Sequence, residues 1–145
     1  MNDPEVLTVL RQWLRYAEED LQVAETLLDK GGVPRTSCFH AQQAAEKAIK
    51  AIFVFLQEEY LYSHDLDRLR DRLPEGWEVK EKFPDLAGLT AWAVEARYPG
   101  DVIEASRQDA QAAVEQARNV YETILNELKR RGYQPENPDN TEEGA

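Results

Sequence analysis

Residues 35–57 read RTSCFHAQQAAEKAIKAIFVFLQ, and this stretch decides the fold. Stepping by about 100° per residue along a helix places five polar side chains within roughly one third of the circumference. They are His40, Gln43, Glu46, Lys47 and Lys50. Nearly all other positions are small or apolar, and a helix of this kind is buried among its neighbours. The stretch therefore predicts one long, central helix with a narrow polar stripe.

Three further helices of useful length are predicted around it. Apolar residues in 4–28 alternate in steps of three and four, which indicates an amphipathic helix. Residues 83–97 and 102–131 repeat that spacing, and Pro99 with Gly100 separates them. Residues 65–73 are expected to form a short helix with leucines facing inward. Because no segment alternates like a strand, we expect an all-α fold, an antiparallel up-and-down bundle of four main helices plus one short helix.

A chain of 145 residues is long enough for one domain with a real core. We predict that residues 1–131 form the helical bundle and that residues 132–145 form a disordered acidic tail, since the tail is almost free of apolar residues. No apolar run is long enough to span a bilayer. The N-terminus lacks the basic start and apolar block of a secretory signal, so we expect a cytoplasmic protein.

The formal net charge is -11, and the tail accounts for only part of it. Proteins that bind long nucleic acids through phosphate neutralisation usually present a basic face. The charge balance therefore argues against broad, sequence-independent nucleic-acid binding, while a small local site remains compatible with it.

Signatures of common enzymes and metal sites are missing from the sequence. It contains no glycine-rich phosphate loop, no paired cysteines at metal-ligand spacing, no HExxH and no GxSxG. Histidine occurs only at positions 40 and 64, and cysteine only at position 38. We therefore predict no metal and no cofactor, and we interpret Cys38 as a small core residue.

Four ordered blocks of the sequence resemble the HEPN family. One is the central stretch CFHAQQAAEKAIKA at residues 38–51, followed by HDL at 64–66 and ARYP at 96–99. The fourth lies in the first helix and consists of Trp13, Ala17, Asp20, Leu21 and Ala24. The similarity extends over about residues 13–128, which is nearly all of the predicted bundle.

The resemblance implies an α-helical bundle that forms a homodimer. Some members of the family are metal-independent RNases, often toxins, and others accompany a minimal nucleotidyltransferase or bind nucleotides or RNA. The RNase members use an Arg followed, after four to six residues, by a His in a late helix. There the His transfers protons and the Arg stabilises charge on the phosphate.

The present sequence departs from that RNase pattern. Arg118 and Asn119 begin it in the last helix, but no histidine follows, because His64 is the last one in the chain. The same absence applies to Arg97. Arg35 and His40 have the required spacing, but they lie at the start of the central helix, and we interpret their spacing as chance.

The polar stripe leaves two interpretations open. In the structural one, Lys47 and Lys50 pair with carboxylates, for which the candidates are Asp20, Glu46 and Asp65. In the functional one, a groove accepts the phosphate of a nucleotide or an RNA end. Its candidate lining residues are His40, Gln43, Lys47, Lys50, His64, Arg97 and Tyr98.

Three functions follow from these interpretations. The preferred one is a HEPN-type module that binds a nucleotide, an RNA or a partner and acts with a minimal nucleotidyltransferase in a toxin–antitoxin-like system. The alternatives are a metal-independent RNase, in which His40 or His64 works with Arg97 or Arg35, and a purely structural helical adaptor. The missing late histidine favours a protein that is not an enzyme.

Overall fold

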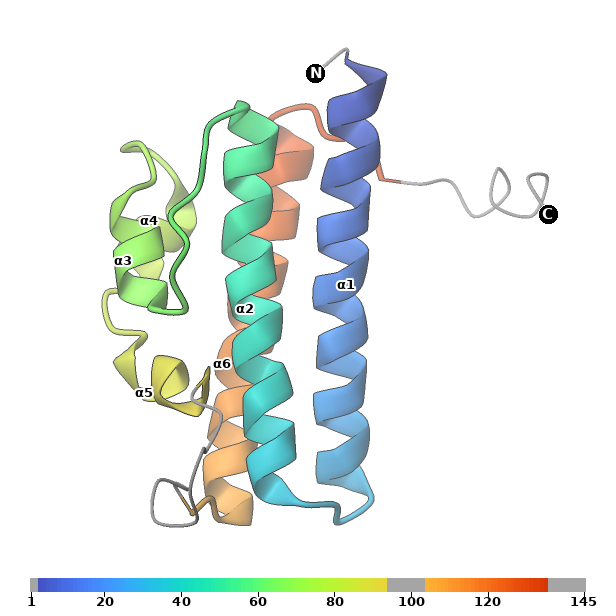
Figure 1. The fold of residues 1–145 in the computed structure, drawn as a ribbon, viewed down its shortest axis with the longest axis vertical. Coiled ribbons are helices and arrows are strands. Elements are labelled where there is room, and N and C mark those ends of the chain that lie inside the picture. Colours follow the sequence, from blue (N-terminus) through green and yellow to red (C-terminus); the bar gives the residue numbers. More distant parts are fainter. Residues whose placement is uncertain (1–2, 94–103, 136–145) are drawn as a thin grey trace, which may run out of the picture.

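The computed structural model describes residues 3–93 and 104–135. Three long helices dominate it: α1 (Pro4–Asp29), α2 (Pro34–Leu56) and α6 (Arg107–Arg130). Between α2 and α6 lie α3 (Leu66–Asp71), α4 (Glu78–Lys82), α5 (Ala87–Thr90) and the 3-10 helix η1 (Ala91–Ala93). The described residues contain no strand. The predicted all-α helical bundle is therefore confirmed (Figure 1).

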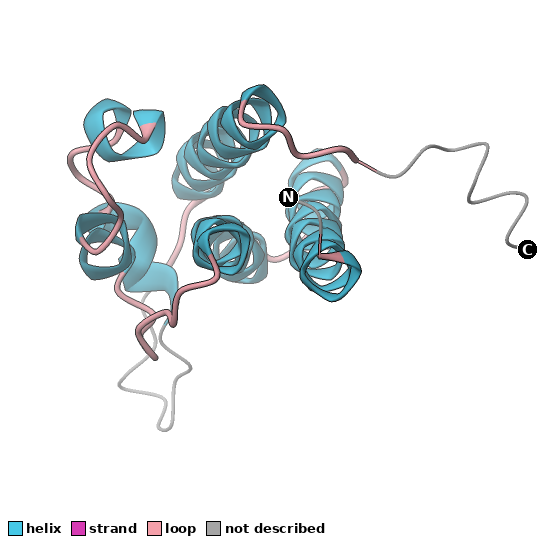
Figure 2. Cartoon of the chain, turned by 90° about the horizontal axis from the view of Figure 1, so that it is seen from above, coloured by secondary structure: helices cyan, strands magenta, loops and turns pink. Residues whose placement is uncertain are grey.

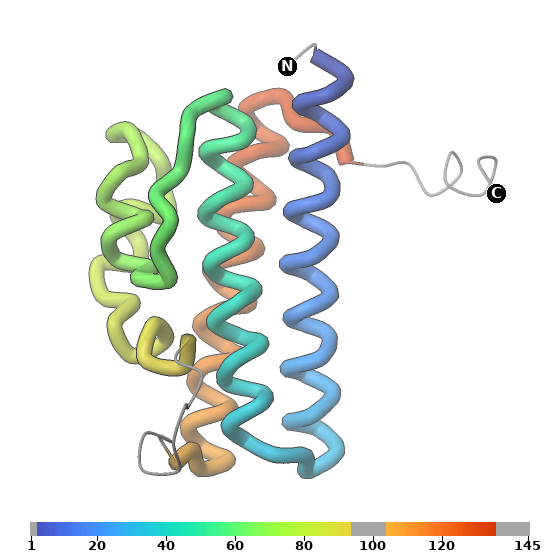
Figure 3. The backbone as a smooth tube through the Cα atoms, viewed as in Figure 1, coloured from blue at the N-terminus to red at the C-terminus, as the bar shows by residue number. Residues whose placement is uncertain are grey.

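The long helices stand side by side, with α2 in the middle of the molecule. α2 packs against both α1 and α6, and the short helices cover its remaining side (Figures 1 and 2). α1 and α2 are antiparallel, whereas α6 runs in the same direction as α2 (Figure 3). The short helices make the return path that lets α6 start at the same end as α2.

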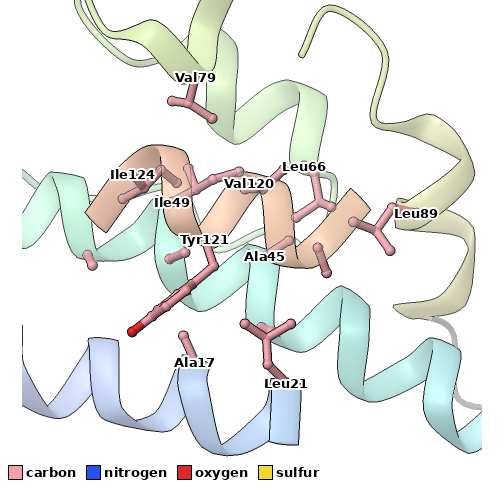
Figure 4. Close-up of a cluster of buried hydrophobic side chains, with 14 of the residues drawn as sticks. Ala17, Leu21, Ala45, Ile49, Leu66, Val79, Leu89, Val120, Tyr121 and Ile124 are labelled. Atoms are coloured by element: carbon pink, nitrogen blue, oxygen red, sulfur yellow. The ribbon is translucent and has the colours of Figure 1, made fainter. Parts of the chain in front are cut away.

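The central position of α2 follows from its small side chains. Five of its alanines are fully buried, and alanine allows neighbouring helices to approach closely: Ala41, Ala44, Ala45, Ala48 and Ala51. Larger side chains from the surrounding elements fill the remaining space, among them Leu21 of α1, Leu66 of α3, Leu89 of α5 and Ile124 of α6 (Figure 4). One core therefore joins all of these elements.

Local signals in the sequence set several helix ends. The Asp3 side chain accepts a hydrogen bond from the Glu5 amide, and Pro4 occupies the first turn of α1. Gly31 follows α1 with a φ of 72°, a conformation that suits glycine. Ser106 and Asp109 form a reciprocal capping box at the start of α6.

Two helix predictions need correction. The last helix begins at Arg107 rather than at 102, because the Ser106 capping box starts it there, and residues 104–106 are not helical. The expected helix over 83–97 is represented by α5 and η1 in its described part. Residues 94–103, which hold its predicted end and Pro99–Gly100, lie outside the described residues.

The helix α4 was not predicted from the sequence. Trp77, its N-cap residue, provides no side-chain cap. Instead, the buried Glu127 side chain of α6 accepts a hydrogen bond of 2.6 Å from the Glu78 amide. A carboxylate at a helix N-terminus stabilises it. A residue far away in the sequence thus caps α4.

Beyond α6, Tyr133 is buried against the bundle. Residues 136–145, most of the predicted acidic tail, lie outside the described residues. None of the helices in the described part is both long and apolar enough to cross a membrane.

Candidate functional site

The polar stripe of α2 faces α1 on one side and the segment after α2 on the other. His40 and Lys47 have side chains that are 30% and 27% exposed. In the same stripe, Glu46 and Lys50 are only 6% and 9% exposed. The stripe therefore has an accessible edge and a buried part.

Asp20 of α1 contacts both His40 and Lys47, the two residues of the accessible edge. One carboxylate oxygen lies 2.9 Å from Nδ1 of His40, and the other accepts a hydrogen bond of 2.5 Å from Nζ of Lys47. The Asp20 side chain is itself largely buried. It serves two residues of α2 that are seven positions apart, about two helical turns, and so links α1 to the stripe.

Glu46 is the centre of the buried part. Its Oε2 accepts a hydrogen bond of 2.9 Å from Lys50, and its Oε1 lies 2.8 Å from Nδ1 of His64. Gln42 adds a third contact at 3.1 Å. Burial alone raises the pKa of Glu46, but the hydrogen bonds from Lys50, His64 and Gln42 and the charge of Lys50 outweigh it. The pKa lies below its ordinary value of 4.5.

Gln42 is a member of the site that the sequence analysis missed. Its fully buried side chain donates to Glu46 and also, at 3.1 Å, to the carbonyl of His64. The predicted Gln43 in turn donates to Gln42 at 2.7 Å. The spacing of four residues between Gln42 and Glu46, which places them on one helix face, was the signal that could have identified it.

Aromatic rings border the buried ion pair. The Lys50 ammonium lies 5.2 Å from the centre of the Tyr60 ring, a favourable cation–π distance. Tyr60 packs edge-on against Trp13 of α1 and against Tyr62. These rings complete the environment of Lys50 with an apolar wall.

The remaining candidates lie elsewhere. Asp65 does not pair with the lysines of the stripe; its side chain caps α3 by accepting from the amides of Asp67 and Arg68. Arg97 and Tyr98 lie outside the described residues. Five of the seven candidate binding residues thus lie in two networks along the stripe: His40 and Lys47 meet at Asp20, and Gln43, Lys50 and His64 gather around Gln42 and Glu46.

Arg118, which occupies the arginine position of the RNase pattern, lies on a different face, between α6 and α1. Its guanidinium donates to Glu18 at 3.0 Å and also to Glu25. Burial lowers the pKa of Arg118, but both carboxylates raise it by more. The nearby Tyr121 has its pKa raised to about 12 by burial and by Glu18. The positive charge of Arg118 is thus balanced inside the chain.

Neither metal chemistry nor thiol chemistry is indicated in the described part of the chain. No group of three or more His, Cys, Asp or Glu residues there is arranged to hold a metal ion. Cys38 is buried, and burial together with Asp109 raises its pKa to about 11, so the unreactive thiol predominates at neutral pH.

The buried ion pair predicts how stability depends on pH. Glu46→Gln leaves the Lys50 charge unpaired, and breaking a buried pair costs about 3–5 kcal/mol. Because the folded-state pKa of Glu46 is lowered, its stabilising effect is complete above pH 4.5 and is lost as the pH falls through the folded-state value. Urea unfolding should show the full difference from the wild type at pH 7 and a shrinking difference below pH 4.5.

The matched control for this prediction is Glu75→Gln. Glu75 pairs with Lys80 at the surface and is 86% exposed, so its removal should change stability little at any pH. A Glu46→Gln effect that is equally large at pH 3 and pH 7 would contradict the assigned role of the carboxylate.

Comparisons with known proteins agree with this architecture. "Putative toxin MJ1304" of Methanocaldococcus jannaschii is 29% identical over 132 residues, which cover 81% of this chain and 86% of that protein. TT1696 of Thermus thermophilus shares 27% identity and superposes with a TM-score of 0.70, covering 81% of this chain and 96% of its own. ST0689, an archaeal HEPN homologue, shares the fold with a TM-score of 0.64 at 23% identity, covering 82% and 97%. The model of the HEPN domain matches residues 10–128, so the chain belongs to the HEPN family.

Proposed function

We propose that this protein is the HEPN component of a toxin–antitoxin-like system, and that it binds the phosphate of a nucleotide or an RNA at the accessible edge of the α2 stripe. Membership of the family and the similarity to a protein that carries a toxin name support the first part. The geometry of two histidines supports the second part.

Both histidines meet a carboxylate through the same ring nitrogen. Nδ1 of His40 faces Asp20, and Nδ1 of His64 faces Glu46. A carboxylate in that position fixes the ring orientation and favours the tautomer protonated at Nδ1. Nε2 remains for a ligand: in the neutral tautomer it accepts a hydrogen bond, for example from a hydroxyl group of the ligand, and in the imidazolium it donates to a phosphate oxygen. Among the described residues neither Nε2 has a hydrogen-bond partner. The His64 side chain is 68% exposed, which gives such a ligand access.

The charge of the stripe limits the size of the ligand. Asp20 balances Lys47, and Glu46 balances Lys50, so the site presents little excess positive charge. Extended contact with a nucleic-acid backbone needs several unbalanced cations. A single phosphate group or an RNA end fits this arrangement better, in agreement with the acidic chain.

Binding can be tested with Lys47→Met and Lys80→Met as a matched pair. Both changes remove an ion-paired lysine, but only Lys47 lies in the stripe. Lys47→Met should weaken binding of a fluorescent single-stranded RNA or of AMP by about tenfold with little change in melting temperature, whereas Lys80→Met should not. Equal binding by both variants would favour the purely structural adaptor.

The proposal also includes a minimal nucleotidyltransferase as partner and a cytoplasmic homodimer as the working form. A nucleotidyltransferase encoded beside the gene should co-purify with the tagged protein after co-expression. Light scattering on the isolated protein should give twice the 16.6 kDa chain mass. Recovery of the HEPN protein alone, in the absence of any bound nucleotide, would count against this function.

A metal-independent RNase is the second candidate, because a carboxylate–histidine pair is also the arrangement that orients a general base. In EDTA, RNA cleavage should then be lost in His40→Ala or His64→Ala. Intact RNA, or cleavage that is unchanged in both variants, excludes this candidate. Arg35 is an unsuitable partner for His40, since five helical positions separate them by about 140° around α2.

A further inference from the structure

A second polar site lies outside the stripe, in the groove between α1 and α6. The groove is open to solvent and has a volume of about 290 Å³, and Tyr133 and Pro135, in the segment that follows α6, are among its lining residues. Figure 2 shows this segment passing from α6 toward α1. Three basic residues line the groove, namely Arg11 and Arg15 of α1 and Lys129 of α6.

One hydrogen-bond donor of Arg11 has no acceptor among the described residues. Its Nη2 donates to the carbonyl of Gln134 at 3.0 Å. Its Nε is covered from solvent and has no hydrogen-bond partner, the one such side-chain atom in the described part of the chain. Buried donors are nearly always paired with protein, water or an ion. The Arg11 guanidinium therefore has capacity for one more acceptor.

Arg15 and Lys129 are also without a carboxylate partner among the described residues, although the chain as a whole has a net charge of -11. Arg15 packs over the ring of Tyr16 at 5.6 Å. Of the two carboxylates that line the groove, Glu18 is bound to Arg118, and Glu19 is exposed on the surface of α1. The groove thus carries three basic side chains against two carboxylates, of which Glu18 is already bound to Arg118, on an acidic protein.

The walls between these charges are apolar. Leu14, Tyr121 and Leu125 line the groove beside the basic residues. Small-molecule sites typically combine such walls with a few placed polar groups, in volumes upward of about 300 Å³. The size of this groove matches a small phosphorylated molecule, with its anion against the cations and its flat part against the apolar wall.

We infer that the α1–α6 groove binds a phosphomonoester through Arg11, Arg15 and Lys129. Guanidinium groups recognise phosphate oxygens with paired hydrogen bonds, and the lysine supplies a third charge. This site shares no residue with the α2 stripe, so the inference does not depend on the function proposed above.

The test compares the double variant Arg15→Gln/Lys129→Gln with the control Arg130→Gln. Arg15 and Lys129 are exposed, so their loss leaves the core intact. Arg130 neighbours Lys129 on α6 but pairs with Glu78 away from the groove. Calorimetric titration with inorganic phosphate and with AMP should show binding by the wild type and by Arg130→Gln, and at least about tenfold weaker binding by the double variant.

A second variant, Arg11→Met, removes the unpaired buried donor. Because it also removes the Nη2 bond to Gln134, it should lower the melting temperature slightly without phosphate, and it should abolish the rise that phosphate causes in the wild type. A titration with 5′-phosphorylated and 5′-hydroxyl oligonucleotides separates the sources of the group: preference for AMP indicates a free nucleotide, and preference for the phosphorylated oligonucleotide indicates an RNA end.

Three results would overturn the inference. They are the absence of binding of phosphate, AMP and phosphorylated oligonucleotide at millimolar concentration, equal binding by the double variant and Arg130→Gln, and loss of all phosphate binding in Lys47→Met while the double variant still binds as the wild type does. A groove covered by a second copy of the chain would give the first of these results.

Discussion

The structure depends on satisfying the polar groups of a helix that is buried on nearly every side. α2 lies between α1, α6 and the short helices, so Glu46 and Lys50 lose most of their contact with water. Desolvating two opposite charges is costly, and attraction offsets the cost only where further hydrogen bonds complete the pair. Gln42, His64 and the ring of Tyr60 complete it here. The buried position of Glu46 and Lys50 is therefore stable only because these partners are present.

This requirement also organises the chain after α2. The ring of His64 contacts Glu46, and its backbone carbonyl accepts a hydrogen bond from Gln42. The segment between α2 and α3 is therefore held along α2. Asp65, the next residue, caps α3. One short sequence therefore satisfies the buried carboxylate and starts the path of short helices. That path determines that α6 runs parallel to α2.

Much of the fold could be predicted from the sequence, because its signals are local. Alternating apolar steps and nearby caps indicated α1, α2 and most of α6. The start of α4 could not be predicted, since its cap is Glu127, 49 positions from Glu78. The same holds for the site. Helical geometry placed the polar stripe on α2 but did not pick out Gln42. The choice between Asp20 and Asp65 as partners for the lysines depends on tertiary packing, which no local pattern encodes.

The environment of Arg118 bears on how this chain could evolve. Four to six intervening residues after Arg118 would put a histidine at position 123, 124 or 125, and the structure has Thr123 and Ile124 buried there and Leu125 partly buried. A histidine gained at 123 or 124 would enter the core and one at 125 would line the α1–α6 groove, and in each case Arg118 would still be held by Glu18 and Glu25. Freeing Arg118 to face such a histidine would therefore require further substitutions at Glu18 and Glu25 of α1.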